Sequence, residues 1–205
     1  EPAAARSGGP RAGLAADASA RNDAARVFRK ESDDLTAYIN SYLERPEDAT
    51  IEAYYKIIDG KLREQEIEKA ESYGIDCTDL HEALVLSDKL AERERHAFAL
   101  MARASGMIAY APQQVQDYEL TESENRLSRS QKISAARQLI GGKEYNDFKL
   151  AIYEKVDDFE ENVLLSTREL LTEQNGQISH YLGIQRILIM LENVVVMIFV
   201  ITLYV

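Results

Sequence analysis

The sequence predicts an all-α protein: an antiparallel up-down four-helix bundle with long helices, the last of which continues into a transmembrane segment. Three observations support this fold class. The 205 residues include only 10 Gly and 4 Pro, which favours long uninterrupted helices. Apolar residues recur at helical spacing through most of the chain, as in amphipathic helices. The chain also ends on an uncharged apolar run, residues 194–205.

The first two helices are predicted from apolar stripes and from the residues that end them. Residues 1–21 are rich in Ala, Gly, Pro and Arg, so we interpret them as a disordered lead-in or a remnant of cloning. The first helix is expected over residues 22–44 and ends before Pro46, because proline disfavours helix at the residue before it. The second is expected over residues 49–73, with Gly74 as its C-cap.

The remaining helices follow from the same kind of evidence. Thr78 is a natural N-cap for a third helix to about residue 107, and residues 111–128 are expected to form a loop with room for one helical turn. A short helix over residues 130–140 should end at Gly141-Gly142. The last helix then keeps one apolar phase from Tyr145 to Leu188, with a polar patch at residues 172–177 that is either a flexible joint or a solvated stretch of helix.

Residues 184–205 are predicted to be a transmembrane helix, because about twenty apolar residues are needed to cross a bilayer. Glu192 and Asn193 are then expected near an interface or inside a helix pair, since a carboxylate at the bilayer centre is costly. The alternative is a buried C-terminal helix of a soluble bundle.

Composition and motifs argue against several classes of function. The net charge of −11 would repel a phosphate backbone, so no nucleic-acid partner is expected. The single cysteine, Cys77, excludes a disulfide within the chain, and His81, His96 and His180 lack the Glu-x-x-His spacing of helical di-iron sites. Catalytic elbows and phosphate-binding glycine motifs are also missing. We therefore expect no metal, no cofactor and no enzymatic activity.

Polar residues on the apolar stripe of the third helix are the more informative feature. Ser87 and Glu94 interrupt that stripe, and a buried carboxylate must meet a cation, a hydroxyl network or a ligand. Arg63 and Arg103 are candidate partners of Glu94. Aromatic residues Tyr54, Tyr55, Phe98 and Tyr110 either line a pocket or form plain core. The candidate ligand-binding residues are Tyr55, Arg63, Ser87, Glu94, Phe98 and Arg103. The alternative for Glu94 is a salt bridge that specifies the bundle, or a partly solvated edge.

The order of these features resembles a known group of receptors. The resemblance is carried by LTAYINSY at residues 35–42, by KLRE at residues 61–64, by SDKL at residues 87–90 with Glu94 and Ala97-Phe98 after it, and by GKEY at residues 142–145. The chain is similar to the four-helix-bundle sensor modules that lie outside the membrane in bacterial chemoreceptors, transmembrane histidine kinases and membrane-bound diguanylate cyclases. Unlike those receptors, it shows no first span before its first helix.

The resemblance implies that residues 22–183 are an extracytoplasmic sensor domain in the cell membrane. Such a domain would form a homodimer, bind a small molecule or a periplasmic binding protein, and pass a helix displacement through the membrane to a cytoplasmic output domain. Two other classes stay open: a membrane-anchored structural or adaptor bundle without a small-molecule ligand, and a soluble helical partner-binding protein.

Overall fold

The computed structural model describes the backbone of residues 10–204 and the side chains of residues 19–193, except 167, 169–171 and 173–175. The described backbone is helical and contains no strand, which confirms the all-α class. The chain divides into two compact units, Glu1–Glu161 and Asn162–Val205. Each unit is described by itself.

The first helix is longer than its apolar stripe predicts. Helix α1 spans Pro10–Glu44 and so begins well before residue 22, in a segment rich in alanine, the best helix former. It ends ahead of Pro46, as expected. Phe28, Ile39 and Tyr42 are buried on its inner face. The expectation of an unstructured start fails over residues 10–21.

The predicted second helix is two helices. Helix α2 spans Asp48–Gly60 and α3 spans Leu62–Ser72, with Lys61 between them in the left-handed region at φ 50° and ψ 35°. A non-glycine residue in that region is strained. The pair Asp59-Gly60 directly before Lys61 is a turn signal that the prediction of one continuous helix did not use. Gly74, at φ 79°, follows the end of α3 near the predicted stop.

Helix α4 spans Thr78–Ser105 and is followed by Gly106 in the left-handed region at φ 80°. The N-cap is Cys77, one residue before the predicted Thr78, and the carboxylate of Asp76 accepts the backbone N–H of Thr78 at 3.0 Å. Ser87 and Glu94 are buried at 7% and 2% exposure, so both lie on the packed face that the heptad pattern indicated.

The connection after α4 holds more helix than expected. It contains a 3-10 turn at Ile108–Tyr110 and two short helices, α5 at Gln113–Gln116 and α6 at Glu122–Asn125. Helix α7 spans Arg129–Gly141 and packs along α4. Capping boxes begin both α6 and α7, which gives each helix start two satisfied backbone donors.

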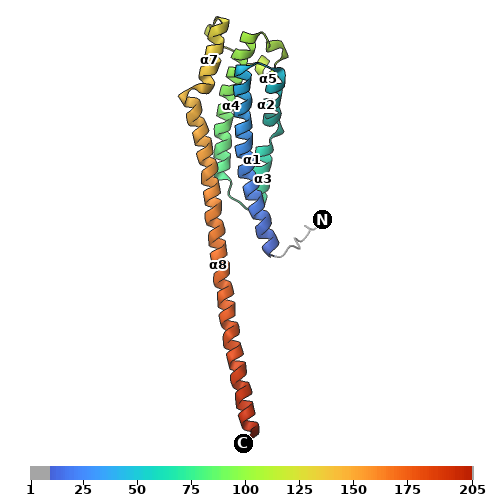
Figure 1. Cartoon of the computed structure of the whole chain (residues 1–205), viewed down its shortest axis with the longest axis vertical. Coiled ribbons are helices and arrows are strands. Elements are labelled where there is room, and N and C mark those ends of the chain that lie inside the picture. The colour runs from blue at the N-terminus through green and yellow to red at the C-terminus, as the bar shows by residue number, and fades with distance from the viewer. Residues whose placement is uncertain (1–9, 205) are drawn as a thin grey trace. The chain divides into compact units, whose positions relative to one another are not determined.

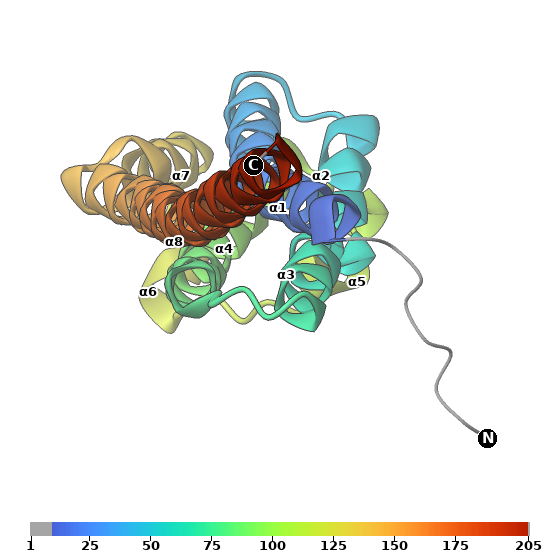
Figure 2. The ribbon, with the colours of Figure 1, turned by 90° about the horizontal axis from the view of Figure 1, so that it is seen from below.

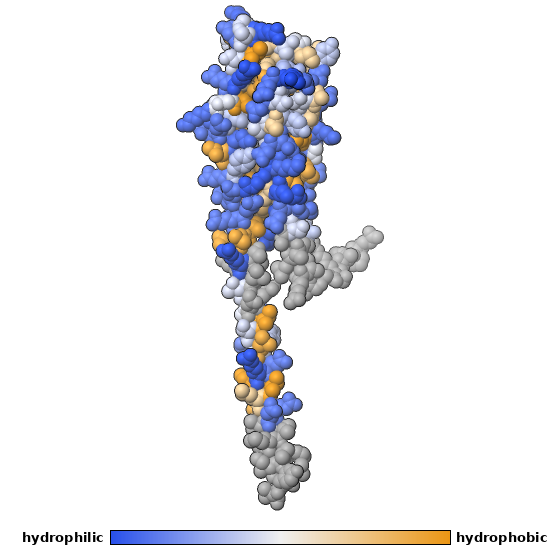
Figure 3. Space-filling view, viewed as in Figure 1, coloured by the Kyte–Doolittle hydropathy of each residue, from blue (hydrophilic) through white to orange (hydrophobic). Residues whose placement is uncertain are grey.

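Helix α8 spans Lys143–Tyr204, and its residues up to Glu161 belong to the first unit. Tyr145, Ile152, Val156 and Phe159 are buried, as the single apolar phase predicted. Helix α1 packs against α2, α3 and α4, and Figures 1 and 2 show these helices side by side. Much of the face of this unit seen in Figure 3 is hydrophilic, so the apolar stripes point inward.

In the second unit, the backbone from Asn162 onward is helical through Tyr204. Many of its described apolar side chains are exposed, including Ile178, Leu188 and Met190. No stretch of helix among the described residues combines the length and the hydropathy of a membrane span. The side chains of residues 194–205 lie outside the described residues, so the predicted span over 184–205 stays a prediction.

Candidate functional site

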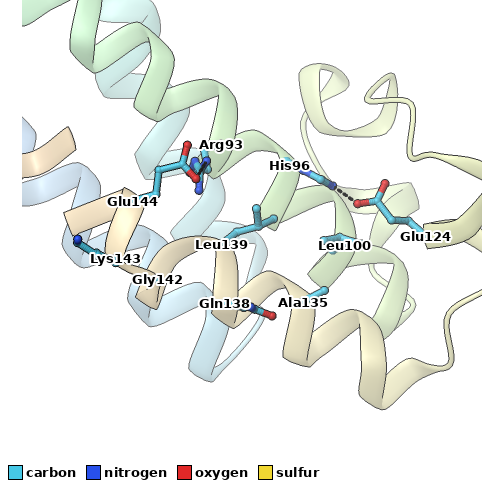
Figure 4. Close-up of a pocket in the computed structure, with 10 residues that line it drawn as sticks. All are labelled: Arg93, His96, Leu100, Glu124, Ala135, Gln138, Leu139, Gly142, Lys143 and Glu144. Carbon is cyan, nitrogen blue, oxygen red and sulfur yellow. Dashed lines mark ion pairs between the residues drawn. The ribbon is translucent and has the colours of Figure 1, made fainter. Parts of the chain in front are cut away.

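A pocket of about 480 Å³ lies where α4, α6, α7 and the start of α8 meet (Figure 4), and we call it the α4–α7 pocket. Its volume falls in the range typical of small-molecule sites. Charged groups line part of its wall and apolar side chains line another. The lining residues are Arg93, His96, Leu100, Glu124, Ala135, Gln138, Leu139, Gly142, Lys143 and Glu144.

One end of the pocket is built on the first turn of α6. Glu124 accepts bonds from the backbone N–H of Thr121 at 2.9 Å and from its hydroxyl at 2.7 Å. His96 Nε2 lies 2.8 Å from the other carboxylate oxygen, and the His96 ring stacks on Tyr118. Burial opposes ionisation of Glu124, but the bonds from Thr121 and the charge of His96 outweigh it and lower its pKa. Glu124 is therefore an anion whose oxygens are already engaged.

The other end of the pocket carries two cations and one anion. Arg93 Nη2 lies 2.6 Å from Glu144 Oε2, and the side chain of Arg93 is 24% exposed where that of Glu144 is 67% exposed. Lys143 lines the same end and forms no salt bridge with another described residue. This end therefore has an excess of positive charge.

Gly142 closes the wall between α7 and α8, where a side chain would not fit. A Cβ placed on this glycine would lie 2.7 Å from the backbone oxygen of Gln138, closer than real Cβ contacts come. The sequence predicted a helix stop at this position. The structure adds that a side chain at this position would collide with the Gln138 carbonyl in the last turn of α7, so the helix end itself requires glycine.

Glu94 follows the pocket residue Arg93 on α4 and is buried between two tyrosine hydroxyls. Tyr54 and Tyr145 each donate a 2.5 Å hydrogen bond, one to each carboxylate oxygen. Burial raises the pKa of Glu94, although these bonds oppose the shift. Burial also raises the pKa of Tyr54 and of Tyr145, so both phenols stay protonated and act as donors. The partner of Glu94 is thus a hydroxyl network, which was one of the three expected alternatives, and the two candidate cations Arg63 and Arg103 bond to other groups.

The pocket and the buried Glu94 cluster are linked through neighbouring residues on α4 and on α8. Arg93 and Glu94 are adjacent on α4, and they bind Glu144 and Tyr145, which are adjacent on α8. The Arg93–Glu144 contact lies at the pocket wall, and the Glu94–Tyr145 contact lies in the core. A change at the wall is therefore one residue away from the core contact on both helices.

A second buried polar cluster surrounds Arg63. Its guanidinium donates to the Ser87 hydroxyl at 2.6 Å, lies 3.4 Å from the carboxylate of Glu31 and covers the ring of Phe28. Burial raises the pKa of Glu31, and the charge of Arg63 partly offsets that effect. The sequence analysis offered Arg63 as a partner of Glu94. In the structure it bonds instead to Ser87 and pairs with Glu31 on α1, which no sequence pattern singled out.

The other predicted site residues have structural contacts. Phe98 packs edge-on against Tyr42 and Tyr54 in an aromatic cluster that also includes Tyr55. Arg103 donates to the backbone oxygens of Ala99, Gln116 and Tyr118 and so ties the loop around α5 to α4. Tyr110 is 68% exposed. None of the six candidates Tyr55, Arg63, Ser87, Glu94, Phe98 and Arg103 lines the α4–α7 pocket, and their role as ligand contacts stays a prediction.

Sequence reasoning missed the pocket residues because they come from four separate elements. The nearest signal was Thr121-x-x-Glu124, which has the spacing of a capping box and marks a helix start inside the predicted loop. Among the side chains that the structure describes, no group of three or more His, Cys, Asp or Glu residues is placed to hold a metal ion. Comparison of the chain with protein-family models, with curated proteins and with solved structures found no match.

Proposed function

We propose that this chain is the ligand-sensing extracytoplasmic part of a bacterial transmembrane signalling receptor, with the α4–α7 pocket as its ligand site. In this proposal the helices of the first unit form an antiparallel up-down four-helix bundle, and residues 184–205 form the transmembrane helix. The chain has no catalytic role, and a cytoplasmic output domain receives its signal.

The observation that carries the proposal is the double contact between α4 and α8. The Arg93–Glu144 ion pair lies at the pocket wall, and the Glu94–Tyr145 bond lies in the core behind it. A ligand that separates the first pair changes the position of the first turn of α8, and Tyr145 belongs to that turn. A two-state change in such a contact, biased by a ligand, is what a sensor needs.

The sequence supports the remaining parts of the proposal. The apolar phase that begins at Tyr145 continues to Leu188, so one helix face runs from the buried core toward the apolar end of the chain. Homodimer formation along the first and last helices is part of the proposal. Motions of about 1 to 2 Å in packed helices are typical of this kind of switching.

A chimeric receptor tests the function. The chain is joined in frame to the cytoplasmic region of a characterised membrane-bound histidine kinase, and its output is read with a transcriptional reporter. Replacing Tyr145 with Phe should change basal output about fivefold or more, the lower end of typical allosteric coupling. The matched variant Tyr110→Phe removes an exposed hydroxyl and should leave the output unchanged.

Two results would overturn the receptor proposal. Recovery of the whole chain in the soluble fraction without detergent would remove the membrane connection. Equal reporter output from the parent chimera and Tyr145→Phe, both present at equal amounts in the membrane, would remove the transmission step.

A second candidate function is a membrane-anchored structural or adaptor bundle without a ligand. The observation in its favour is that Ser87 and Glu94, the polar residues on the packed stripe, are satisfied by Arg63 and by two tyrosines. In this case the pocket is a surface depression that binds no ligand. A thermal-shift screen separates the two functions, because a ligand at 100 times its dissociation constant stabilises by about 2.7 kcal/mol.

A further inference from the structure

We propose that the α4–α7 pocket binds a small organic carboxylate with a short apolar body, whose carboxylate replaces Glu144 on Arg93 beside Lys143. This inference rests on the proposed sensing function and names the chemistry of its ligand. Three features of the pocket carry it: a replaceable anion, an unpaired cation and an apolar wall.

The replaceable anion is Glu144. Its side chain is 67% exposed, whereas the Arg93 guanidinium that it binds is 24% exposed. Exposed ion pairs contribute little to stability, so moving Glu144 into water costs the protein little. Arginine presents a planar array of donors that suits a carboxylate in a bidentate arrangement, which gives an incoming carboxylate a site of matching geometry.

The unpaired cation is Lys143, the residue before Glu144 at the start of α8. It lines the pocket and has no salt bridge to the rest of the described chain. In Figure 4 the Lys143 ammonium points away from Arg93, so Arg93 alone makes the direct contact with a ligand anion and Lys143 adds positive charge at the same end of the pocket. Attraction by this positive charge favours a negatively charged ligand over a neutral one of the same shape.

The apolar wall is formed by Leu100, Ala135 and Leu139, which face the pocket in Figure 4. A short hydrocarbon body would bury apolar surface of Ala135 and Leu139, which are partly exposed, whereas Leu100 is already fully buried. The far end offers little to an amine, because the Glu124 oxygens already accept bonds from Thr121 and lie against His96. The pocket therefore favours a monocarboxylate over an amino acid.

Titration calorimetry on the full chain, in one mild detergent throughout, tests this assignment. The probes are butanoate and hexanoate, with butanamide as the uncharged analogue of the first and inorganic phosphate as a different anion. At least one of the two carboxylates should bind, and butanamide should bind about tenfold more weakly or not at all, as expected for loss of a charge-assisted hydrogen bond.

Two substitutions should act in opposite directions. Arg93→Gln removes the cation and should weaken carboxylate binding about tenfold or more. Glu144→Gln removes the competing anion and should tighten binding, although both variants lose the same ion pair and should be similarly stable. Asp147→Asn is the matched control, because it removes one exposed negative charge from the same helix without touching the pocket.

Several outcomes would overturn the inference. The inference fails if neither carboxylate binds the parent chain or Glu144→Gln, or if butanoate and butanamide bind equally well. It also fails if both Arg93→Gln and Glu144→Gln weaken binding, or if Asp147→Asn tightens binding as much as Glu144→Gln does. Binding of phosphate alone would identify an anion site for a different ligand class. A neutral or cationic ligand whose affinity falls on Leu139→Ala would reject the carboxylate and retain the sensing function, whereas absence of any ligand in a broad thermal-shift screen would count against both.

Discussion

Tyr145, in the first turn of α8, donates a 2.5 Å hydrogen bond to Glu94 in the middle of α4. This bond joins two helices whose contacting residues lie 51 positions apart in the sequence. It also lies one residue from the Arg93–Glu144 ion pair of the pocket wall. Stability and ligand response are therefore expected to depend on the same short segment of α8.

Replacing Tyr145 with Phe should destabilise the fold. The substitution leaves one oxygen of the buried Glu94 without its donor, and an unsatisfied buried acceptor costs about 1–3 kcal/mol. Tyr54→Phe should have a similar effect, because its hydroxyl serves the other oxygen. Urea denaturation of the full chain measures both, with the exposed Tyr110→Phe as control. Loss of less than about 0.5 kcal/mol in both variants would contradict the buried network.

Glu94 should make the protein less stable as the pH rises. Burial raises its pKa above the ordinary 4.5, so the folded protein binds more protons than the unfolded chain above that pH. The stability contributed by the protonated form is present below pH 4.5 and is lost as the pH rises through the raised value. Glu31 acts in the same direction, whereas Glu124, with a lowered pKa, acts in the opposite one.

The contribution of Glu94 can be isolated with Glu94→Gln, which stays neutral at every pH. The difference in unfolding free energy between the variant and the parent should grow in favour of the variant from about pH 4 to pH 8. Chemical denaturation at a series of pH values measures this difference. A difference that stays constant across the range would mean that the pKa of Glu94 is the same in the folded and unfolded states.

Replacing Arg63 with Met should cost about 3 kcal/mol or more, because it leaves the carboxylate of Glu31 buried without its cation. Adding Glu31→Gln should restore part of the loss, since the neutral amide needs no counter-charge. A double-mutant cycle by denaturation gives the coupling energy of the pair. Strictly additive effects would show that the 3.4 Å contact contributes nothing.

Lys61→Gly should stabilise the protein by up to about 1 kcal/mol, because glycine adopts the left-handed conformation without the strain that a side chain adds. Lys61→Val should have the opposite effect, since a β-branched side chain is disfavoured there. Thermal unfolding of both variants measures the change. Destabilisation by glycine would indicate that the side chain of Lys61 stabilises the fold by more than its left-handed backbone conformation costs.

Arg103→Ala should loosen the loop around α5 without unfolding the helices. The substitution removes the donor to the backbone oxygens of Gln116 and Tyr118, and Tyr118 stacks on His96 of the pocket. Hydrogen exchange should accelerate over residues 113–121 and stay unchanged in the buried part of α4. The control is Arg129→Ala, which removes an exposed arginine at the start of α7. Equal hydrogen-exchange rates over residues 113–121 in the two variants would show that the Arg103 bonds do not hold this loop.

The sequence-based reasoning worked best where one helix carries a long repeating pattern. The heptad positions of α4 placed Ser87 and Glu94 on its packed face, and both are buried. The apolar phase of α8 from Tyr145 also marked residues that are buried in the first unit. It failed at Lys61, where the short turn signal Asp59-Gly60 was outweighed by the apolar stripe on both sides of it. It failed also in the loop after α4, where short helices depend on caps and not on periodicity.

By itself the sequence determined the all-α class, the approximate position of the long helices and the burial of a carboxylate on α4, because all three follow from the spacing of residues along one helix. Only the tertiary structure decided that Glu94 meets Tyr54 and Tyr145, that Arg63 meets Glu31, and that four elements enclose a pocket around Arg93. Those contacts join residues distant along the chain, and their geometry depends on how the helices pack, which leaves no periodic trace in the sequence.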